Sequence, residues 1–169
     1  MSKASLCFII QGERVLLIRK KRGVGAGKIN GPGGKVEAGE SMLDSAVRET
    51  REEIGVTPLG LELRGELFFD FVGSRMVHCG VFVARDFEGE PVETDEAIPI
   101  WHSTGAIPYD EMWEDDRVWF PLLLAGKCFR GGATVDPGDK VREIFATELS
   151  ASDLAASCRV AVPSEGGVA

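Results

Sequence analysis

The strongest constraint on this chain is a group of three glutamates, Glu49, Glu52 and Glu53, within residues 34–56. In a helix they stand at i, i+3 and i+4, so their carboxylates crowd one side of the helix and repel one another. A hard divalent cation turns this repulsion into affinity, because magnesium prefers oxygen ligands and bridges to substrate phosphates. The pattern therefore favours metal-assisted phosphoryl chemistry. The alternative is a solvated acidic helix face.

The residues around the glutamates predict where this helix begins and ends. We expect it to span residues 41–54, with Ser41 as the N-cap residue and Gly55 as the left-handed stop. Its apolar and small residues should pack on a sheet, because helical spacing brings them to one face. These residues are Leu43, Ala46, Val47, Thr50 and Ile54.

The loop before the helix has features that suit a ligand site. Gly33 and Gly34 carry no side chain, so the backbone can come close to a metal ion or a phosphate. Glu40 enters the helix and Arg48 lies two turns along it, which allows the pair to brace the loop against the helix. These neighbours favour the functional interpretation of the three glutamates over the solvated face.

The rest of the chain indicates one domain built on a mixed sheet. Short apolar runs bounded by turn residues predict strands, and Pro108 opens a second helical or irregular segment that reaches about residue 125. The predicted strands cover residues 4–11, 14–19, 61–72, 76–85, 96–101, 127–134 and 140–148. We expect a domain over residues 1–149 and a weakly ordered tail, rich in Ala, Ser and Gly, over residues 150–169.

Composition excludes several classes of function. The net charge of −8 argues against binding to a nucleic acid polymer. No apolar stretch is long enough to span a bilayer, and the N-terminal run lacks the features of a signal peptide, so a cytoplasmic location is expected.

The four cysteines lack the spacing of a zinc or redox site, and are expected to be reduced and mostly buried. With two histidines, neither a His-based zinc site nor a Ser-His-Asp triad is supported.

Residues 34–56 resemble the Nudix box, a long motif that opens on a glycine and ends on a glycine and an apolar residue. The fixed positions of that motif are met by Gly34, Glu40, Arg48, Glu49, Glu52, Glu53 and Gly55. Thr50 departs from it, since an aliphatic residue is usual there. The resemblance implies the Nudix fold, of the α/β (more narrowly α+β) class: a central mixed β-sheet sandwiched by helices, with a loop-helix-loop at the box.

The likeness extends over about residues 4–148 to the oxidised purine nucleoside triphosphate hydrolases, homologues of MutT that act on 8-oxo-dGTP and 2-hydroxy-dATP. Beyond the box it rests on residues 20–31, 33–36, 69–73, 94–96, 112–116 and 119–124. It implies water attack on the β-phosphorus, which releases the nucleoside monophosphate and pyrophosphate. It also implies Mg²⁺, or Mn²⁺ in its place, as the cofactor.

The resemblance also implies roles for individual residues. Glu49, Glu52 and Glu53 would be catalytic. The metal ligands would be these three glutamates with Gly33, through its carbonyl, and Glu96. The substrate-binding residues would be Ser5, Lys20, Asn30, Gly33, Gly34, Lys35, Phe69, Trp113, Asp115 and Asp116.

Physical chemistry supports the base-binding part of this interpretation. An aromatic side chain such as Trp113 can stack on any base. Two adjacent carboxylates, Asp115 and Asp116, can share one proton in a dry pocket, so that one donates and the other accepts. The alternatives are an exposed acidic loop and a tryptophan that only packs, which is the favoured interpretation for Trp119.

Some positions differ from those of the resembled enzymes, and they leave the preferred purine open. Val24 and Pro32 stand where an aromatic is common, Ser5 stands for a threonine, and Gly80 stands near the place of a larger side chain. One alternative is therefore hydrolysis of ordinary nucleoside triphosphates or of a nucleoside diphosphate derivative. Another is a non-catalytic nucleotide-binding regulator, although the complete set of glutamates counts against it. We expect a monomer that acts on small-molecule nucleotides and binds neither nucleic acid nor membrane.

Overall fold

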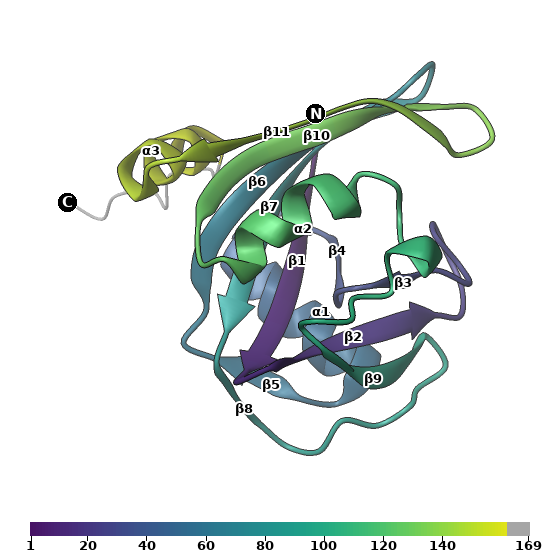
Figure 1. The fold of residues 1–169 in the computed structure, drawn as a ribbon, viewed down its shortest axis with the longest axis vertical. Helices are drawn as coiled ribbons and strands as arrows, with labels where there is room; N and C mark the ends of the chain where they lie inside the picture. Colours follow the sequence, from purple (N-terminus) through teal and green to yellow (C-terminus); the bar gives the residue numbers. More distant parts are fainter. Residues whose placement is uncertain (162–169) are drawn as a thin grey trace.

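The computed structural model describes the backbone of residues 1–161 and the side chains of residues 1–158, and it shows a curled mixed sheet with helices on both faces (Figure 1). The strands are β1 (Ser2–Gln11), β2 (Arg14–Lys20), β3 (Ile29–Asn30), β4 (Gly33–Lys35), β5 (Thr57–Leu59), β6 (Glu62–Phe71), β7 (Arg75–Ala84), β8 (Asp86–Glu88), β9 (Ala97–Ser103), β10 (Cys128–Asp136) and β11 (Lys140–Leu149). The helices are α1 (Met42–Ile54), α2 (Asp116–Leu124), α3 (Ala151–Ala161) and the short 3-10 helix η1 (Tyr109–Glu111).

The main sheet mixes parallel and antiparallel pairs, as the sequence predicts. Its strands follow the order β11-β10-β6-β7-β1-β2-β3, while β4 pairs with β1 and β9 pairs with β2. The pairs β1–β7 and β6–β10 are parallel, and the other pairs are antiparallel. Strands β5 and β8 form a separate ribbon. Strands β3, β4, β5 and β8 have only two or three residues, too few for an alternating pattern to reveal them in the sequence.

The core consists of two apolar layers, one on each face of the sheet. Side chains of strand β1 belong to both layers, because successive side chains of a strand point to opposite faces. Phe8 packs with residues of α2 such as Trp119, while Ile9 packs with residues of α1 such as Ala46. Helices α1 and α2 therefore cover opposite faces of the sheet (Figure 1).

Helix α1 confirms the predicted caps but not the whole predicted face. The Oγ of Ser41 accepts a hydrogen bond from the Asp44 backbone N–H at 3.0 Å, and Gly55 adopts a left-handed φ of 75°. Leu43, expected in the core, is 42% exposed, whereas Met42 is buried. The reason is the helical period: Met42 lies one turn before Ala46 on the buried stripe, and Leu43 is rotated about 100° away from it.

The prediction of a weakly ordered tail is wrong for residues 151–161, which form α3. Leu154 and Cys158 lie one helical turn apart and are 1% and 5% exposed. They supply a narrow apolar stripe that packs against β6 and β10. Alanine, one of the residues on which the prediction of a weakly ordered tail was based, is also the strongest helix former. A short apolar stripe is therefore enough to hold the helix when a sheet is available to pack against. The remainder of the predicted tail, residues 162–169, lies outside the described residues.

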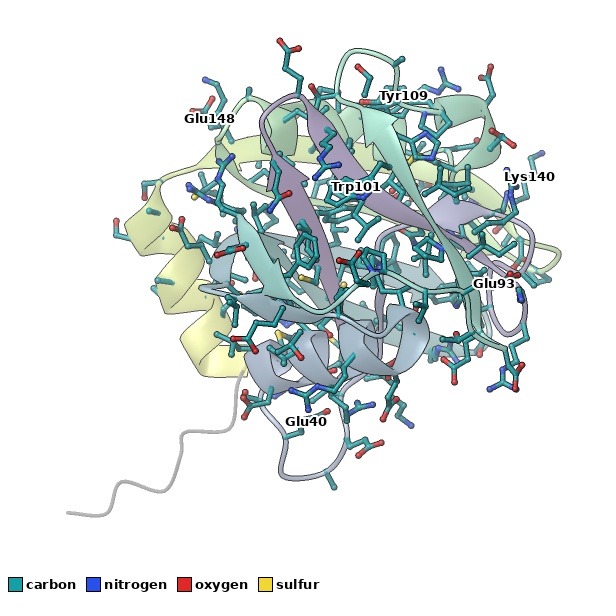
Figure 2. The ribbon with its side chains drawn as sticks, turned by 90° about the horizontal axis from the view of Figure 1, so that it is seen from below. Glu40, Glu93, Trp101, Tyr109, Lys140 and Glu148 are labelled. Carbon is teal, nitrogen blue, oxygen red and sulfur yellow. The ribbon has the colours of Figure 1, made fainter. Side chains whose placement is uncertain are left out.

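Helix α3 lies beside the start of α1 (Figure 2). The two helices share an apolar groove lined by Ser41, Met42, Leu43, Leu63, Phe82, Ala155 and Cys158. Within the described part of the chain, no helix has both the length and the apolarity that crossing a membrane requires.

Candidate active site

The acidic site lies on the edge of α1 that faces the loop before β9. Carboxylate oxygens of Glu49, Glu53 and Glu96 lie within 4.8 Å of one another. Glu53 is 4% exposed, and its Oε2 has no hydrogen-bond partner. An ionised carboxylate does not stay buried and unpaired without a cation or a proton. This cluster therefore has the donor chemistry of a site for a hard divalent cation.

Glu52 does not join this cluster. Its side chain is 52% exposed and pairs with Arg48 at 3.2 Å. On an α-helix Glu53 lies about 40° from Glu49, whereas Glu52 lies about 60° away on the other side of Glu49. The spacing that places three glutamates on one helix side thus brings two of them into the site, and the metal-binding role of Glu52 stays a prediction.

Burial and like charge shape the ionisation of the two gathered glutamates. Burial, and next the charge of Glu49, raise the pKa of Glu53 to about 8, and the nearby Lys20 ammonium partly opposes this. Burial also raises the pKa of Glu49, while Arg48 acts in the opposite direction. A divalent cation would favour the ionised forms of both groups.

Arg48 holds the loop and the acidic edge together, as the sequence suggests. Its guanidinium donates to both carboxylate oxygens of Glu40, at 2.7 and 2.9 Å, and to Glu49 at 3.0 Å. It also donates to the carbonyl oxygen of Lys35 at 3.1 Å. The hydrogen bond from Arg48 is the main cause that lowers the pKa of Glu40. Figure 2 shows Glu40 beside α1.

The two glycines of the loop are required for different steric reasons. A Cβ on Gly33 would lie 2.0 Å from the backbone oxygen of Ser5, because β4 runs directly beside β1. A Cβ on Gly34 would lie 2.6 Å from Oε1 of Glu49. Gly33 therefore allows the strands to pair, and Gly34 leaves room for the carboxylate of Glu49.

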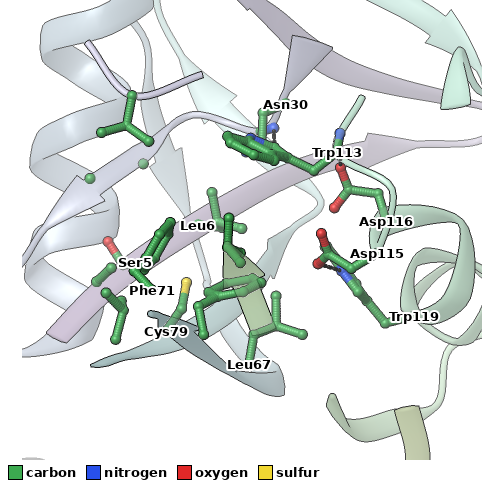
Figure 3. A pocket seen from close by; sticks show the side chains of 18 of the residues that line it. Ser5, Leu6, Asn30, Leu67, Phe71, Cys79, Trp113, Asp115, Asp116 and Trp119 are labelled. Carbon is green, nitrogen blue, oxygen red and sulfur yellow. Dashed lines mark hydrogen bonds between the residues drawn. The ribbon is translucent and has the colours of Figure 1, made fainter. Parts of the chain in front are cut away.

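A cavity of about 180 Å³ lies on the other side of the loop, between the sheet and α2 (Figure 3). Figure 3 shows Trp113 and Asn30 close together on one side of it and Asp115 and Asp116 on another. The predicted substrate-binding residues that line it are Ser5, Lys20, Asn30, Gly33, Gly34, Phe69, Trp113, Asp115 and Asp116. Lys35 is the exception: its side chain is exposed and is not part of the cavity wall.

Asp115 and Asp116 are buried, so the alternative of an exposed acidic loop is wrong. They are 2% and 3% exposed at the start of α2. Oδ2 of Asp116 accepts from the Trp113 backbone N–H at 3.1 Å, and Oδ2 of Asp115 accepts from Nε1 of Trp119 at 3.0 Å. Burial, and next the charge of Asp115, raise the pKa of Asp116, and burial raises the pKa of Asp115. The pair can therefore present a hydrogen-bond donor and acceptors side by side.

A second hollow adjoins the first and contains the acidic cluster. It is lined by Lys20, Arg22, Gly23, Gly33, Gly34, Glu49, Glu53 and Glu96. Lys20, Gly33 and Gly34 line both spaces, so the apolar cavity opens next to the carboxylates. An apolar, aromatic compartment beside a charged one suits a ligand with a base at one end and phosphates at the other.

Several residues of the cavity were missed by the sequence analysis. Leu67 and Phe71 lie two residues before and after Phe69 on β6, so their side chains point to the same face of the strand. This period of two could have revealed them once Phe69 was named. Arg75, whose guanidinium lies 5.2 Å from the centre of the Phe71 ring, also lines the cavity. It comes from β7, and no local sequence signal indicates that position. Trp119, expected to pack, is fully buried and also reaches the cavity wall.

The fold and the acidic helix together define a class of protein. The chain matches the family model of the NUDIX domain over residues 2–123, and it belongs to this family of hydrolases. It is 46% identical to the oxidized purine nucleoside triphosphate hydrolase of Danio rerio over 128 residues, which cover 75% of this chain and 82% of that protein. The enzyme of the same name from Mus musculus is 44% identical over the same shares of the two chains.

Solved structures agree with this assignment of the fold. The MutT protein of Bacillus halodurans superposes with a TM-score of 0.77 at 26% identity, over 86% of this chain and 97% of that one. The MutT protein of Methanosarcina mazei gives a TM-score of 0.61 at 22% identity, over 74% and 94% of the two chains, and shows the fold alone.

Proposed function

We propose that this Nudix hydrolase splits oxidised purine nucleoside triphosphates, such as 8-oxo-dGTP and 2-hydroxy-dATP, into the monophosphate and pyrophosphate, and so removes them from the nucleotide pool. The observation that carries the proposal is the buried pair Asp115 and Asp116 in an apolar cavity that adjoins the acidic cluster. The names of the relatives from Danio rerio and Mus musculus support the same class of substrate.

The base end of the substrate fits the cavity between the sheet and α2. Trp113 offers a stacking surface, and Asn30 offers an amide group beside it. Because a proton can reside on either Asp115 or Asp116, the pair can match bases with different donor patterns. Both 8-oxo-guanine and 2-oxo-adenine differ from normal purines in this pattern, which is the basis for selecting them.

The phosphate end fits the acidic hollow with a bound cation. Two observations support Mg²⁺ as the cation, with Mn²⁺ as a substitute: three carboxylates converge, and Oε2 of Glu53 is buried without a partner. When bound, the cation would supply charge neutralisation and activation of water. Glu49, Glu53 and Glu96 would hold it, with the carbonyl of Gly33 as a further ligand.

Other side chains of the hollow would orient the phosphates. Lys20 lies between the two compartments, and its Nζ donates to the carbonyl oxygen of Val24 at 2.7 Å. Arg22 pairs with Glu96 at 3.1 Å and is 65% exposed, so it can turn toward an anionic ligand. These two cations would attract the triphosphate to a protein whose net charge is −8.

A substrate panel under Mg²⁺ tests the proposal. Pyrophosphate release would be measured for 8-oxo-dGTP, 2-hydroxy-dATP, dGTP, dATP and ADP-ribose. We expect the highest kcat/KM for an oxidised purine, and Glu53→Gln should lower kcat by orders of magnitude, whereas Glu88→Gln on exposed β8 should not. Equal kcat/KM for dGTP and 8-oxo-dGTP, or a preference for ADP-ribose, would move the assignment to ordinary triphosphates or to a diphosphate derivative. Nucleotide binding without turnover would indicate a regulator.

The proposal also covers the setting of the reaction. The ligand is a free nucleotide and not a nucleic acid polymer, because the acidic chain lacks the positive charge that a phosphate backbone requires. One chain supplies both compartments, so a monomer suffices for the reaction. We further propose a cytoplasmic location, where the enzyme would meet its nucleotide substrates.

A further inference from the structure

A second cluster of potential metal ligands lies on the sheet face opposite the base cavity. It consists of Glu66 on β6, His78 on β7 and Cys158 on α3. Their neighbours Leu67 and Cys79 line the base cavity, and successive side chains of a strand point to opposite faces. Glu66 and His78 therefore point away from the substrate, toward α3.

The donor atoms of this cluster converge on one buried point. Oε2 of Glu66 lies 2.8 Å from Nε2 of His78 and 3.5 Å from Sγ of Cys158. The three ligand atoms all lie within 4.8 Å of one another. Glu66, His78 and Cys158 are 0%, 3% and 5% exposed. Sequence spacing does not reveal this group, because His78 and Cys158 are 12 and 92 residues from Glu66.

Surrounding groups hold the donors in place, as outer-shell partners do in metal sites. Nε of Arg130 donates to Oε1 of Glu66 at 2.7 Å, and Oγ of Ser157 lies 2.7 Å from the same oxygen and 2.9 Å from Oε2. The ring of Phe68 stacks on the imidazole of His78, with centroids 4.4 Å apart and planes 2° from parallel. Oε2, Nε2 and Sγ thus face one another with their side chains restrained.

We propose that Glu66, His78 and Cys158 form a second metal site, selective for Zn²⁺, that fastens α3 to the sheet. One thiolate, one imidazole and one carboxylate are ligand types of zinc, whereas Mg²⁺ prefers oxygen ligands such as the carboxylates of the acidic helix. The apolar groove between α1 and α3 reaches Cys158. The three side chains supply three ligands of a tetrahedral zinc site and leave the fourth position for a water molecule.

The consequence of the site is structural support and not turnover. Helix α3 contacts β6 and β10, and β6 carries Leu67, Phe69 and Phe71 of the base cavity on its other face. A cation that binds the folded protein and not the unfolded chain adds to its stability by mass action. Zn²⁺ would therefore raise the thermal stability of the whole domain, independently of the reaction at the acidic helix.

Cobalt titration tests the site directly, because Co²⁺ replaces Zn²⁺ and absorbs strongly in the near ultraviolet when a thiolate binds it. Metal-free full-length protein would be titrated with Co²⁺ in excess Mg²⁺, so that Mg²⁺ would fill the proposed carboxylate site. We expect a thiolate-to-cobalt band that saturates at one equivalent and is bleached by Zn²⁺. Cys158→Ser should abolish the band, whereas Cys128→Ser, a free cysteine on β10 outside the cluster, should keep it. Glu53→Gln should also keep it.

Thermal unfolding provides the second measurement. Serine at position 158 retains a hydroxyl that can donate to Glu66, so this variant removes the soft ligand while leaving a hydrogen bond possible. We expect Zn²⁺ to raise the Tm of the wild type and of Cys128→Ser, and to leave that of Cys158→Ser unchanged. Absence of the cobalt band in the wild type, or the same zinc response in Cys158→Ser, would overturn the proposal and leave the cluster as a hydrogen-bond network only.

Discussion

The indole Nε1–H of Trp119 donates a hydrogen bond to Oδ2 of Asp115 at 3.0 Å, one turn back along α2. Trp119 is fully buried and stacks on Phe129 with ring centroids 5.4 Å apart, so the core fixes the position of the indole. Asp115 in turn is held at the wall of the cavity between the sheet and α2. The residue that packs the core thus also orients a carboxyl group of the proposed base site.

We therefore expect Trp119→Phe to affect both stability and substrate binding. The change removes a hydrogen bond to a buried carboxyl group, at a cost of about 1–3 kcal/mol, and leaves a cavity in the core. Denaturant unfolding should show this loss of stability. Steady-state kinetics on the oxidised purine substrate should show a larger rise in KM than fall in kcat, because Trp119 positions Asp115 and does not act on the phosphates. Trp101→Phe, a half-buried tryptophan on β9, is the control, and an unchanged KM for Trp119→Phe would contradict the prediction.

The stability of the protein should depend on the ionisation of Asp116. Its pKa in the folded protein is raised well above the ordinary value, by burial and then by Asp115, with Lys28 opposing. The folded state therefore holds the proton more tightly than the unfolded chain, and stability is lost as the pH rises from about 4 through the folded pKa. Asp116→Asn cannot ionise. Its Tm relative to the wild type should increase from pH 5 to pH 8, and parallel Tm curves would show that Asp116 ionises freely.

Alanine substitutions at the two loop glycines should separate folding from catalysis. Gly33→Ala places a methyl group against the backbone of β1, where nothing flexible can move, and should destabilise the fold by about 1–3 kcal/mol. Gly34→Ala meets only the end of the Glu49 side chain, which can rotate away. Gly34→Ala should therefore keep most of its stability and lose activity and Mg²⁺ affinity. Thermal melts and Mg²⁺ dependence of the rate check both, and the reverse ranking of stabilities would refute the steric argument.

Arg48→Lys should weaken the metal site although the charge is kept. A lysine ammonium has no planar fork, so it cannot reach Glu40, Glu49 and the carbonyl of Lys35 together. We expect the rate to fall by about tenfold or more, equivalent to about 1.4 kcal/mol, and the Mg²⁺ concentration for half-maximal rate to rise. Arg51→Lys on the same helix, where the guanidinium contacts only the hydroxyl of Thr57 among the described groups, is the matched control. Equal effects of the two variants would show that Arg48 acts only through its charge.

The sequence predicts the acidic helix well because its signals are local. Ser41 and Gly55 cap α1 as expected, and the spacing of Glu49 and Glu53 brings them together. Leu43 and Glu52 show the limit of this reasoning, because both side chains are exposed to solvent. A shift of one residue turns a side chain by about 100° around the helix, which is enough to move it from the core or the site into solvent. Side-chain period alone does not fix that angle to the required accuracy.

The chain by itself determined the family, the helix with its caps, and most of the residues that we propose to bind the base or the cation at the acidic helix. These depend on residue types at short, fixed spacings. Only the tertiary structure decided that Asp115 and Asp116 are buried, that Glu96 joins Glu49 and Glu53, and that Glu66, His78 and Cys158 meet beneath α3. The physical reason is that burial and contacts between distant strands and helices arise when the sheet pairs and its faces are covered, and no local sequence pattern carries that information.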